Sequence, residues 1–176
     1  MFEFQEEINV AEKDVIIKEK LKYTGYGDFK DIYNYAHDWL RGELYSVTED
    51  NYAEKVKGNS KELDIAWKAS KKITDYFKVE MDVKWKVLGM EDVEVEIDGK
   101  KKKMNKFAEI KFELKGTLVK DYTNQWNQSA TTKFFKEIYH KYVIPSRTDQ
   151  MEDKIKNDVI DFKEEMKAFL ELSGKR

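Results

Sequence analysis

The stretch YFKVEMDVKWKVLG, residues 76–89, decides the fold. From Phe77 to Val87 every second residue is apolar, and a lysine, glutamate or aspartate stands at each position between them. Side chains of a strand point alternately to the two faces of a sheet. The pattern therefore predicts a strand with one apolar and one solvated face.

The same alternation recurs in the neighbouring segments ELDIAWKAS (62–70), DVEVEIDG (92–99) and AEIKFELKG (108–116). Near the start, KDVIIKEKLKY (13–23) has β-branched residues between charges and also predicts a strand. The dipeptide Asp98-Gly99 favours a tight hairpin, because a type I′ turn needs positive φ at both central positions. Between 43 and 60, LYSVT (44–48) and YAEKV (52–56) are compatible with two short strands joined by a turn at residues 49–51.

Helical spacing replaces this alternation in two regions. Apolar residues recur every three or four positions in FKDIYNYAHDWLRG (29–42), with Asp28 as the expected N-cap and Gly42 as the stop. After Ser129, a second cap, Phe135, Ile138, Tyr139 and Tyr142 form a stripe that Pro145 ends or kinks. A further stripe from about 148 to 170 predicts another C-terminal helix.

These elements predict an α+β fold. We expect a curved antiparallel sheet packed against a C-terminal helical region, with one helix after the first strand, because amphipathic strands and helices bury their apolar faces against each other. Residues 13–172 are expected to form a single domain, preceded by an N-terminal segment, residues 1–12.

The charge balance argues against a nucleic-acid partner. The 33 basic and 35 acidic residues give a net charge of -2, whereas a nucleic-acid-binding domain is typically basic. Four lysines, Lys100 to Lys103, form a local basic run, but Glu94, Glu96 and Asp98 precede the hairpin turn and are expected to lie across from it.

The counts of cysteine and histidine limit the kinds of active or metal site that the chain can form. The chain has no cysteine and two histidines, His37 and His140, so no metal ligand set, cofactor motif or catalytic constellation is predicted. An enzymatic role is left open but is not the preferred interpretation. No apolar run approaches the roughly 18 residues of a transmembrane helix, and the acidic start lacks the basic region of a signal peptide. We expect a cytoplasmic protein.

The order of elements from about residue 13 to 172 resembles the START-like (SRPBCC) helix-grip superfamily. The resemblance implies a cavity between the sheet and the C-terminal helix that binds an apolar or amphipathic small molecule. It carries over no catalytic residue. The chain departs from the family pattern where Pro145 divides the C-terminal helix.

Aromatic residues make up 14% of the chain and supply the candidate site. Trp67, Phe77, Trp85 and Phe112 share the predicted inner face of the sheet, and Phe135 and Tyr139 are expected to face them from the helix. The leading hypothesis is a small-molecule binding protein with an aromatic-lined cavity. The alternative is a non-enzymatic interaction or scaffold module with a filled core, which could contact nucleic acid through the Lys100–Lys103 hairpin. No protein partner is identified.

Overall fold

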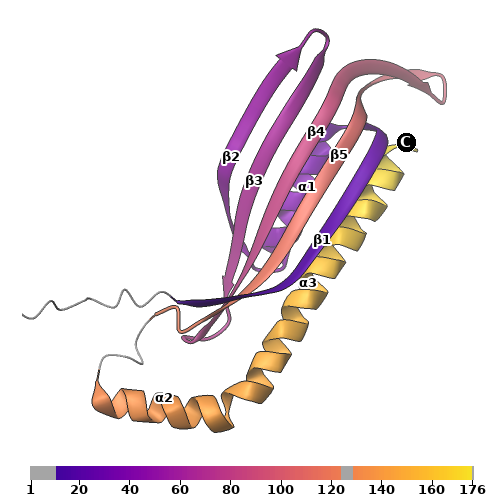
Figure 1. The fold of residues 1–176 in the computed structure, drawn as a ribbon. Helices are drawn as coiled ribbons and strands as arrows, with labels where there is room; N and C mark the ends of the chain where they lie inside the picture. Colours follow the sequence, from indigo (N-terminus) through magenta and orange to yellow (C-terminus); the bar gives the residue numbers. More distant parts are fainter. Residues whose placement is uncertain (1–10, 124–128, 176) are drawn as a thin grey trace, which may run out of the picture.

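The computed structural model describes residues 11–123 and 129–175. Five antiparallel strands form one curved, open sheet in the order β1-β5-β4-β3-β2, and helices follow the first and the last strand (Figure 1). The predicted α+β fold class is confirmed. In chain order the elements are β1 (Glu12–Gly27), α1 (Phe29–Gly42), β2 (Ser46–Lys57), β3 (Ser60–Lys72), β4 (Phe77–Ile97), β5 (Lys100–Lys120), α2 (Ala130–Tyr142) and α3 (Ile144–Ser173).

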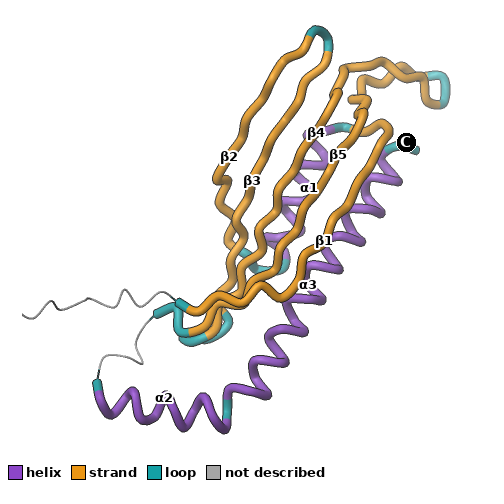
Figure 2. Tube along the Cα trace, viewed as in Figure 1, coloured by secondary structure: helices purple, strands orange, loops and turns teal. Residues whose placement is uncertain are grey.

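The segments 76–89 and 92–99, predicted separately, belong largely to one strand, β4. The pairing of β4 with β5 is interrupted at Gly89, which has a φ of 56° and would bring a Cβ within 2.8 Å of the Ala108 Cβ. Beyond this point the β4–β5 hairpin bends away from the rest of the sheet (Figure 2). Positive φ at Asp98 (51°) and Gly99 (73°) confirms the predicted tight turn.

The lysine run has the cross-strand acidic neighbours that the sequence predicts. Glu94 lies opposite Lys103, and Glu96 lies opposite Lys101, in the register of β4 and β5. Opposite charges at these positions attract each other and reduce the net positive charge of the arm. Nucleic-acid binding by this hairpin stays a prediction.

The sequence of residues 43–60 was compatible with two short strands, and the structure has one continuous strand there. One strand, β2, pairs with β3 on both sides of an irregularity between Glu49 and Asn51. A β-bulge absorbs one extra residue without ending the ladder, so the polar Glu-Asp-Asn sequence that suggested a turn lies inside a continuous strand.

Two helices cover one face of the sheet. Helix α1 begins at its predicted cap, where Asp28 Oδ1 accepts a hydrogen bond from the Asp31 backbone N at 3.2 Å, and it packs over β3 and β4. Helix α3 lies along β1 and β5, and Gly116 permits this close approach because a Cβ there would be 2.5 Å from Ile155 Cγ2. The side of α3 that faces the sheet buries Ile155, Val159, Phe162, Met166 and Leu170.

The C-terminal helical region is divided at Val143, as Pro145 predicts. Pro145 stands in the first turn of α3, a position that lacks intrahelical N–H partners and so tolerates proline. Helix α3 begins at Ile144 and therefore earlier than the predicted position near 148. Helix α2 lies beyond the end of the sheet rather than over its apolar face (Figure 1).

The opposite face of the sheet carries the charged residues. One of them, Glu80, is only 7% exposed and is held by the Nζ atoms of Lys78 at 2.9 Å and Lys13 at 3.1 Å. Burial alone would raise the pKa of Glu80, but the hydrogen bonds from the two lysines outweigh burial and lower it. None of the helices in residues 11–123 and 129–175 is long and apolar enough to cross a membrane.

Candidate functional site

Four of the six aromatic residues predicted to line a site are buried in the core, and the rings of three of them, Trp67, Trp85 and Phe112, are in contact. Trp67, Phe77, Trp85 and Phe112 are each at most 2% exposed. The Trp85 ring centroid lies 4.5 Å from that of Phe112 and 4.8 Å from that of Trp67. These distances are typical of packed aromatic pairs in contact.

Two side chains of α1 pack against the tryptophans of this cluster. Tyr33 lies edge-on to Trp67 with a centroid distance of 4.9 Å, and Phe29 lies 6.4 Å from Trp85. The signal for this arrangement was present in the helical spacing of residues 29–40, but two predicted helical regions had apolar stripes and either could have covered the tryptophans.

The structure does not bring Phe135 and Tyr139 to the tryptophans. Phe135 is 56% exposed on α2. Tyr139 lies 6.3 Å from Tyr76, whose ring is 4.9 Å from Phe77 at the end of the sheet. Their predicted position is therefore corrected, because α2 extends past the sheet instead of lying across it (Figure 1).

A carboxylate borders the aromatic cluster. Glu49 Oε2 accepts hydrogen bonds from the Tyr33 hydroxyl at 2.6 Å and from Trp67 Nε1 at 3.0 Å. Burial, together with the neighbouring Glu49 carboxylate, raises the pKa of Tyr33 to about 12.

Among the described residues, Trp85 Nε1 is buried and has no hydrogen-bond partner. An unpaired buried N–H is unusual, since most buried donors in folded proteins are satisfied.

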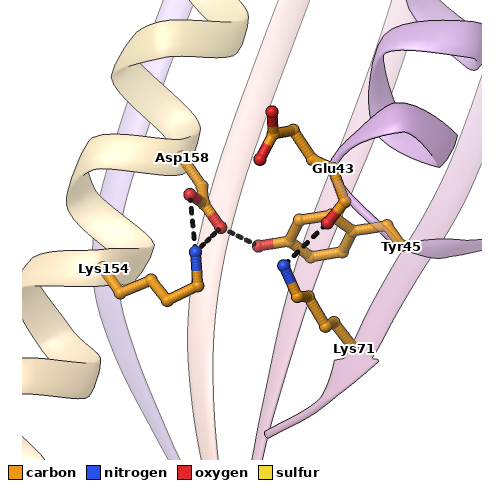
Figure 3. Close-up of polar contacts among 5 residues, drawn as sticks. All are labelled: Glu43, Tyr45, Lys71, Lys154 and Asp158. Carbon is orange, nitrogen blue, oxygen red and sulfur yellow. Dashed lines mark hydrogen bonds and ion pairs between the residues drawn. The ribbon is translucent and has the colours of Figure 1, made fainter.

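A second polar group joins distant parts of the chain (Figure 3). The Tyr45 hydroxyl donates a 2.6 Å hydrogen bond to Asp158 Oδ2, and Lys154 Nζ lies 3.2 Å from Asp158 Oδ1. Tyr45 and Asp158 are 4% and 7% exposed, and Lys71 Nζ lies 5.5 Å from the centre of the Tyr45 ring. Burial, reinforced by the Asp158 carboxylate, raises the pKa of Tyr45.

The contact between Tyr45 and Asp158 links the start of β2 to α3, and no local sequence pattern predicts it. Tyr45 and Asp158 are 113 positions apart. The arrangement contains a donor, a carboxylate and an ammonium group that satisfy one another, which is typical of a structural link between elements.

The two histidines and the possible metal-ligating side chains are considered together. No group of three or more histidine, aspartate or glutamate side chains is positioned there to hold a metal ion. His37 Nδ1 lies 3.9 Å from Asp38 Oδ1, and its ring is 5.8 Å from Trp67. The side chain of His140 lies outside what the structure describes.

Helix α2 presents an apolar face to solvent, which we call the α2 face. It consists of Phe134 (59% exposed), Phe135 (56%), Ile138 (42%) and Tyr142 (71%). Beside it is an open hollow of about 380 Å³ lined by Thr132, Phe135, Ile138, Tyr139 and Val143. The sequence showed this stripe, but its pattern alone favoured burial against the sheet.

The fold and these features define an α+β protein with an aromatic core and an exposed amphipathic helix. No family model, curated protein or solved structure matches the chain.

Proposed function

We propose that the protein is a non-enzymatic interaction module that binds its partner through the α2 face. The supporting observation is the exposure of four large apolar side chains on one side of one helix. Scattered apolar residues are normal on protein surfaces, but a contiguous group of this kind marks interaction sites.

The attachment of α2 to the rest of the protein supports this proposal. Lys136 Nζ forms a 2.9 Å ion pair with Asp121 Oδ2, at the end of the sheet. Tyr139 packs against Tyr76 at the same end of the sheet, with 6.3 Å between the ring centroids. Lys136 and Tyr139 thus face the sheet, and the α2 face lies on another side of the helix.

The packing of the core supports a role that needs no internal ligand cavity. Phe29 and Tyr33 occupy the position over the tryptophans that a ligand of the sheet face would take. The apolar interior is then a source of stability, and the binding surface lies outside it.

Site-specific crosslinking tests the proposal without assuming the partner's chemistry. A photo-crosslinking amino acid replaces Phe135 in the full chain, and a matched variant carries it at Tyr52 of β2, which is 47% exposed. In cells that produce the protein, adducts are expected at position 135 and not at position 52. Equal adducts at both positions, or none at 135, would contradict the proposal.

A second candidate function, binding of an apolar small molecule beside the tryptophans, draws support from the unpaired Trp85 Nε1. A ligand with an acceptor atom would satisfy this donor, provided that α1 moves to admit it. Native mass spectrometry of the purified protein is then expected to show a bound apolar molecule. The Trp85→Phe variant is expected to lose the bound molecule. The Trp39→Phe variant, the matched control on α1, is expected to keep it. An unliganded wild-type protein would argue against this candidate.

A further inference from the structure

The face of the sheet opposite to α1 and α3 is rich in lysine. The register aligns three successive rows of side chains on this face, across β1, β5, β4 and β3. We call them the lysine rows, and they consist of Lys18, Lys115, Asp82 and Lys68; Lys20, Glu113, Lys84 and Ala66; and Lys22, Lys111, Lys86 and Asp64. Eight of these side chains are basic and three are acidic, whereas the whole chain has a net charge of -2. The overall charge balance therefore hides a local positive excess.

Most lysines of the rows have no acidic partner. Three of them form ion pairs, which are Lys115 with Asp82 (2.6 Å), Lys20 with Glu113 (3.4 Å) and Lys22 with Glu109, just beyond the rows (3.4 Å). The other five form no ion pair with any described residue: Lys18, Lys68, Lys84, Lys86 and Lys111. Asp64 is the one carboxylate of the rows without such a pair among the described residues. The positive excess thus remains after the ion pairs are taken into account.

Several of these lysines stand directly opposite one another. Lys111 of β5 lies between Lys22 of β1 and Lys86 of β4. Lys18 lies opposite Lys115. Like charges at directly opposite positions repel each other and lower the stability of a sheet. A negatively charged partner on this face would remove the repulsion, so the arrangement is complementary to an anion.

The extent of the rows favours a partner that carries many negative charges. From Lys18 to Lys22 they extend about 13 Å along β1, and from β1 to β3 they span about 14 Å, given the usual spacings within and between strands. The major groove of a nucleic-acid duplex is about 12 Å wide, so a surface of this width can reach phosphates on both sides of the groove. An open hollow of about 300 Å³ lies within the rows, with Lys20 and Lys84 in its lining.

The composition of the rows separates the classes of polyanion. The rows contain no aromatic and no large apolar side chain. Protein–protein interfaces have an apolar centre, and helices inserted in a membrane surface have an apolar side. Interfaces with nucleic acid are more polar and much more positively charged. Proteins that bind single strands stack the bases on aromatic side chains, so a surface of lysines alone suits the phosphates of a duplex.

We infer that the lysine rows bind the phosphate backbone of a nucleic-acid duplex without sequence preference. Lysine contacts to phosphates position a protein on a duplex but do not distinguish one sequence from another. The surface differs from the Lys100–Lys103 hairpin, where acidic residues lie across from the lysines. It is also separate from the α2 face, so this inference does not depend on the proposed role of α2.

Fluorescence anisotropy of a labelled DNA duplex, titrated with the full chain, tests the inference. The logarithm of the binding constant should fall with the logarithm of the salt concentration with a slope of about -4.5, since each phosphate contact of the five unpaired lysines adds about -0.9. Between about 50 and 200 mM salt the affinity should therefore fall about 500-fold. No binding at about 50 mM salt, or a slope near zero, overturns the inference.

Variants locate the contact. Lys18→Gln with Lys111→Gln removes two of the unpaired lysines, so the slope should change to about -2.7 and binding at about 50 mM salt should weaken about tenfold or more. The matched control is Lys101→Gln with Lys102→Gln, two exposed lysines of the β4–β5 hairpin, which should bind as the wild type does. If the control variant loses as much affinity as the first variant, the contact is not specific to the lysine rows and the inference is overturned.

Urea unfolding of the same variants separates the loss of a contact from the loss of the fold. Lys18 and Lys111 stand opposite other lysines, so Lys18→Gln with Lys111→Gln should unfold at the same or a higher urea concentration than the wild type. Weaker binding by a variant that is at least as stable supports the inference. A variant that is both less stable and weaker in binding would show that these lysines support the fold, which overturns it.

Other polyanions test the class of partner. DNA and RNA duplexes both present a phosphate backbone, and a preference for one of them would identify the source of the ligand. A DNA single strand of the same sequence should bind more weakly, because the rows offer no aromatic side chain for stacking. Vesicles of phosphatidylcholine and phosphatidylglycerol should also bind more weakly than the duplex. Tighter binding of the single strand or of the vesicles overturns the inference.

Discussion

The Tyr45→Phe variant allows the contribution of the buried Tyr45–Asp158 hydrogen bond to stability to be measured. In Tyr45→Phe, Asp158 loses a 2.6 Å hydrogen bond at a position where its side chain is almost inaccessible to water. A hydrogen bond to a charged group contributes about 1.5–3 kcal/mol. Lys154 remains 3.2 Å from the carboxylate and limits the loss, so we expect Tyr45→Phe to lower the free energy of unfolding by about 2 kcal/mol.

The chain contains a matched control for this substitution. Tyr35 also donates a hydrogen bond from its hydroxyl to a carboxylate on α3, Glu165 Oε2, at 2.9 Å. Glu165 is exposed, and water can replace the lost partner. Tyr35→Phe removes the same atom but is therefore expected to cost less than about 0.5 kcal/mol, the range of exposed interactions.

Urea unfolding followed by circular dichroism gives both values from the midpoint and the slope. For a chain of this size, the loss expected for Tyr45→Phe corresponds to a decrease of about 4–8 °C in Tm. Equal losses for the two variants would refute the reasoning, because burial of the acceptor would then have no influence on the energy. A change in slope would indicate that the variant alters the unfolded or native ensemble instead.

Three further outcomes are expected, all measurable by urea unfolding. Gly116→Ala should destabilise the protein by about 1–3 kcal/mol, since the added methyl group overlaps side chains of α3. In Gly42→Ala the added Cβ has no atom within 4 Å, so this variant should be neutral or stabilise the protein by up to about 1 kcal/mol. A loss of stability as large as that of Gly116→Ala would contradict the packing argument. The lowered pKa of Glu80 means that its carboxylate stabilises the fold above its ordinary pKa of 4.5 and that this contribution disappears as the pH falls through the lowered value. Glu80→Gln should therefore be less stable than the wild type at pH 7 and lose less stability on acidification to about pH 3; parallel pH profiles would refute this assignment.

Local patterns predicted the secondary structure well. Asp28 capped α1, and the dipeptide at 98–99 set the β4–β5 turn, because caps and turns depend on residues that are neighbours in the chain. Gly42 is the last residue of α1 but not its cap, since the left-handed residue that closes the helix is Leu44, with a φ of 66°. Residues 46–57 were harder to assign. A bulge and a turn use the same polar residues, and only pairing with β3 distinguishes them.

The candidate site was predicted in part. The inward direction of Trp67 and Trp85 followed from the alternation of the strands, and both are buried. The helix that covers them did not follow, since an amphipathic helix shows that one side is buried and not which surface buries it. The contact between Tyr45 and Asp158 could not be foreseen for the same reason, as its partners are far apart in the chain.

The sequence by itself determined that the middle of the chain forms an antiparallel sheet with one apolar face, because the period of two is a property of each strand. Only the tertiary structure decided that α1 and α3 share that face while α2 leaves it. The reason is physical: each helix shows in its own sequence that one of its sides is apolar, but which surface covers that side depends on contacts between residues far apart in the chain.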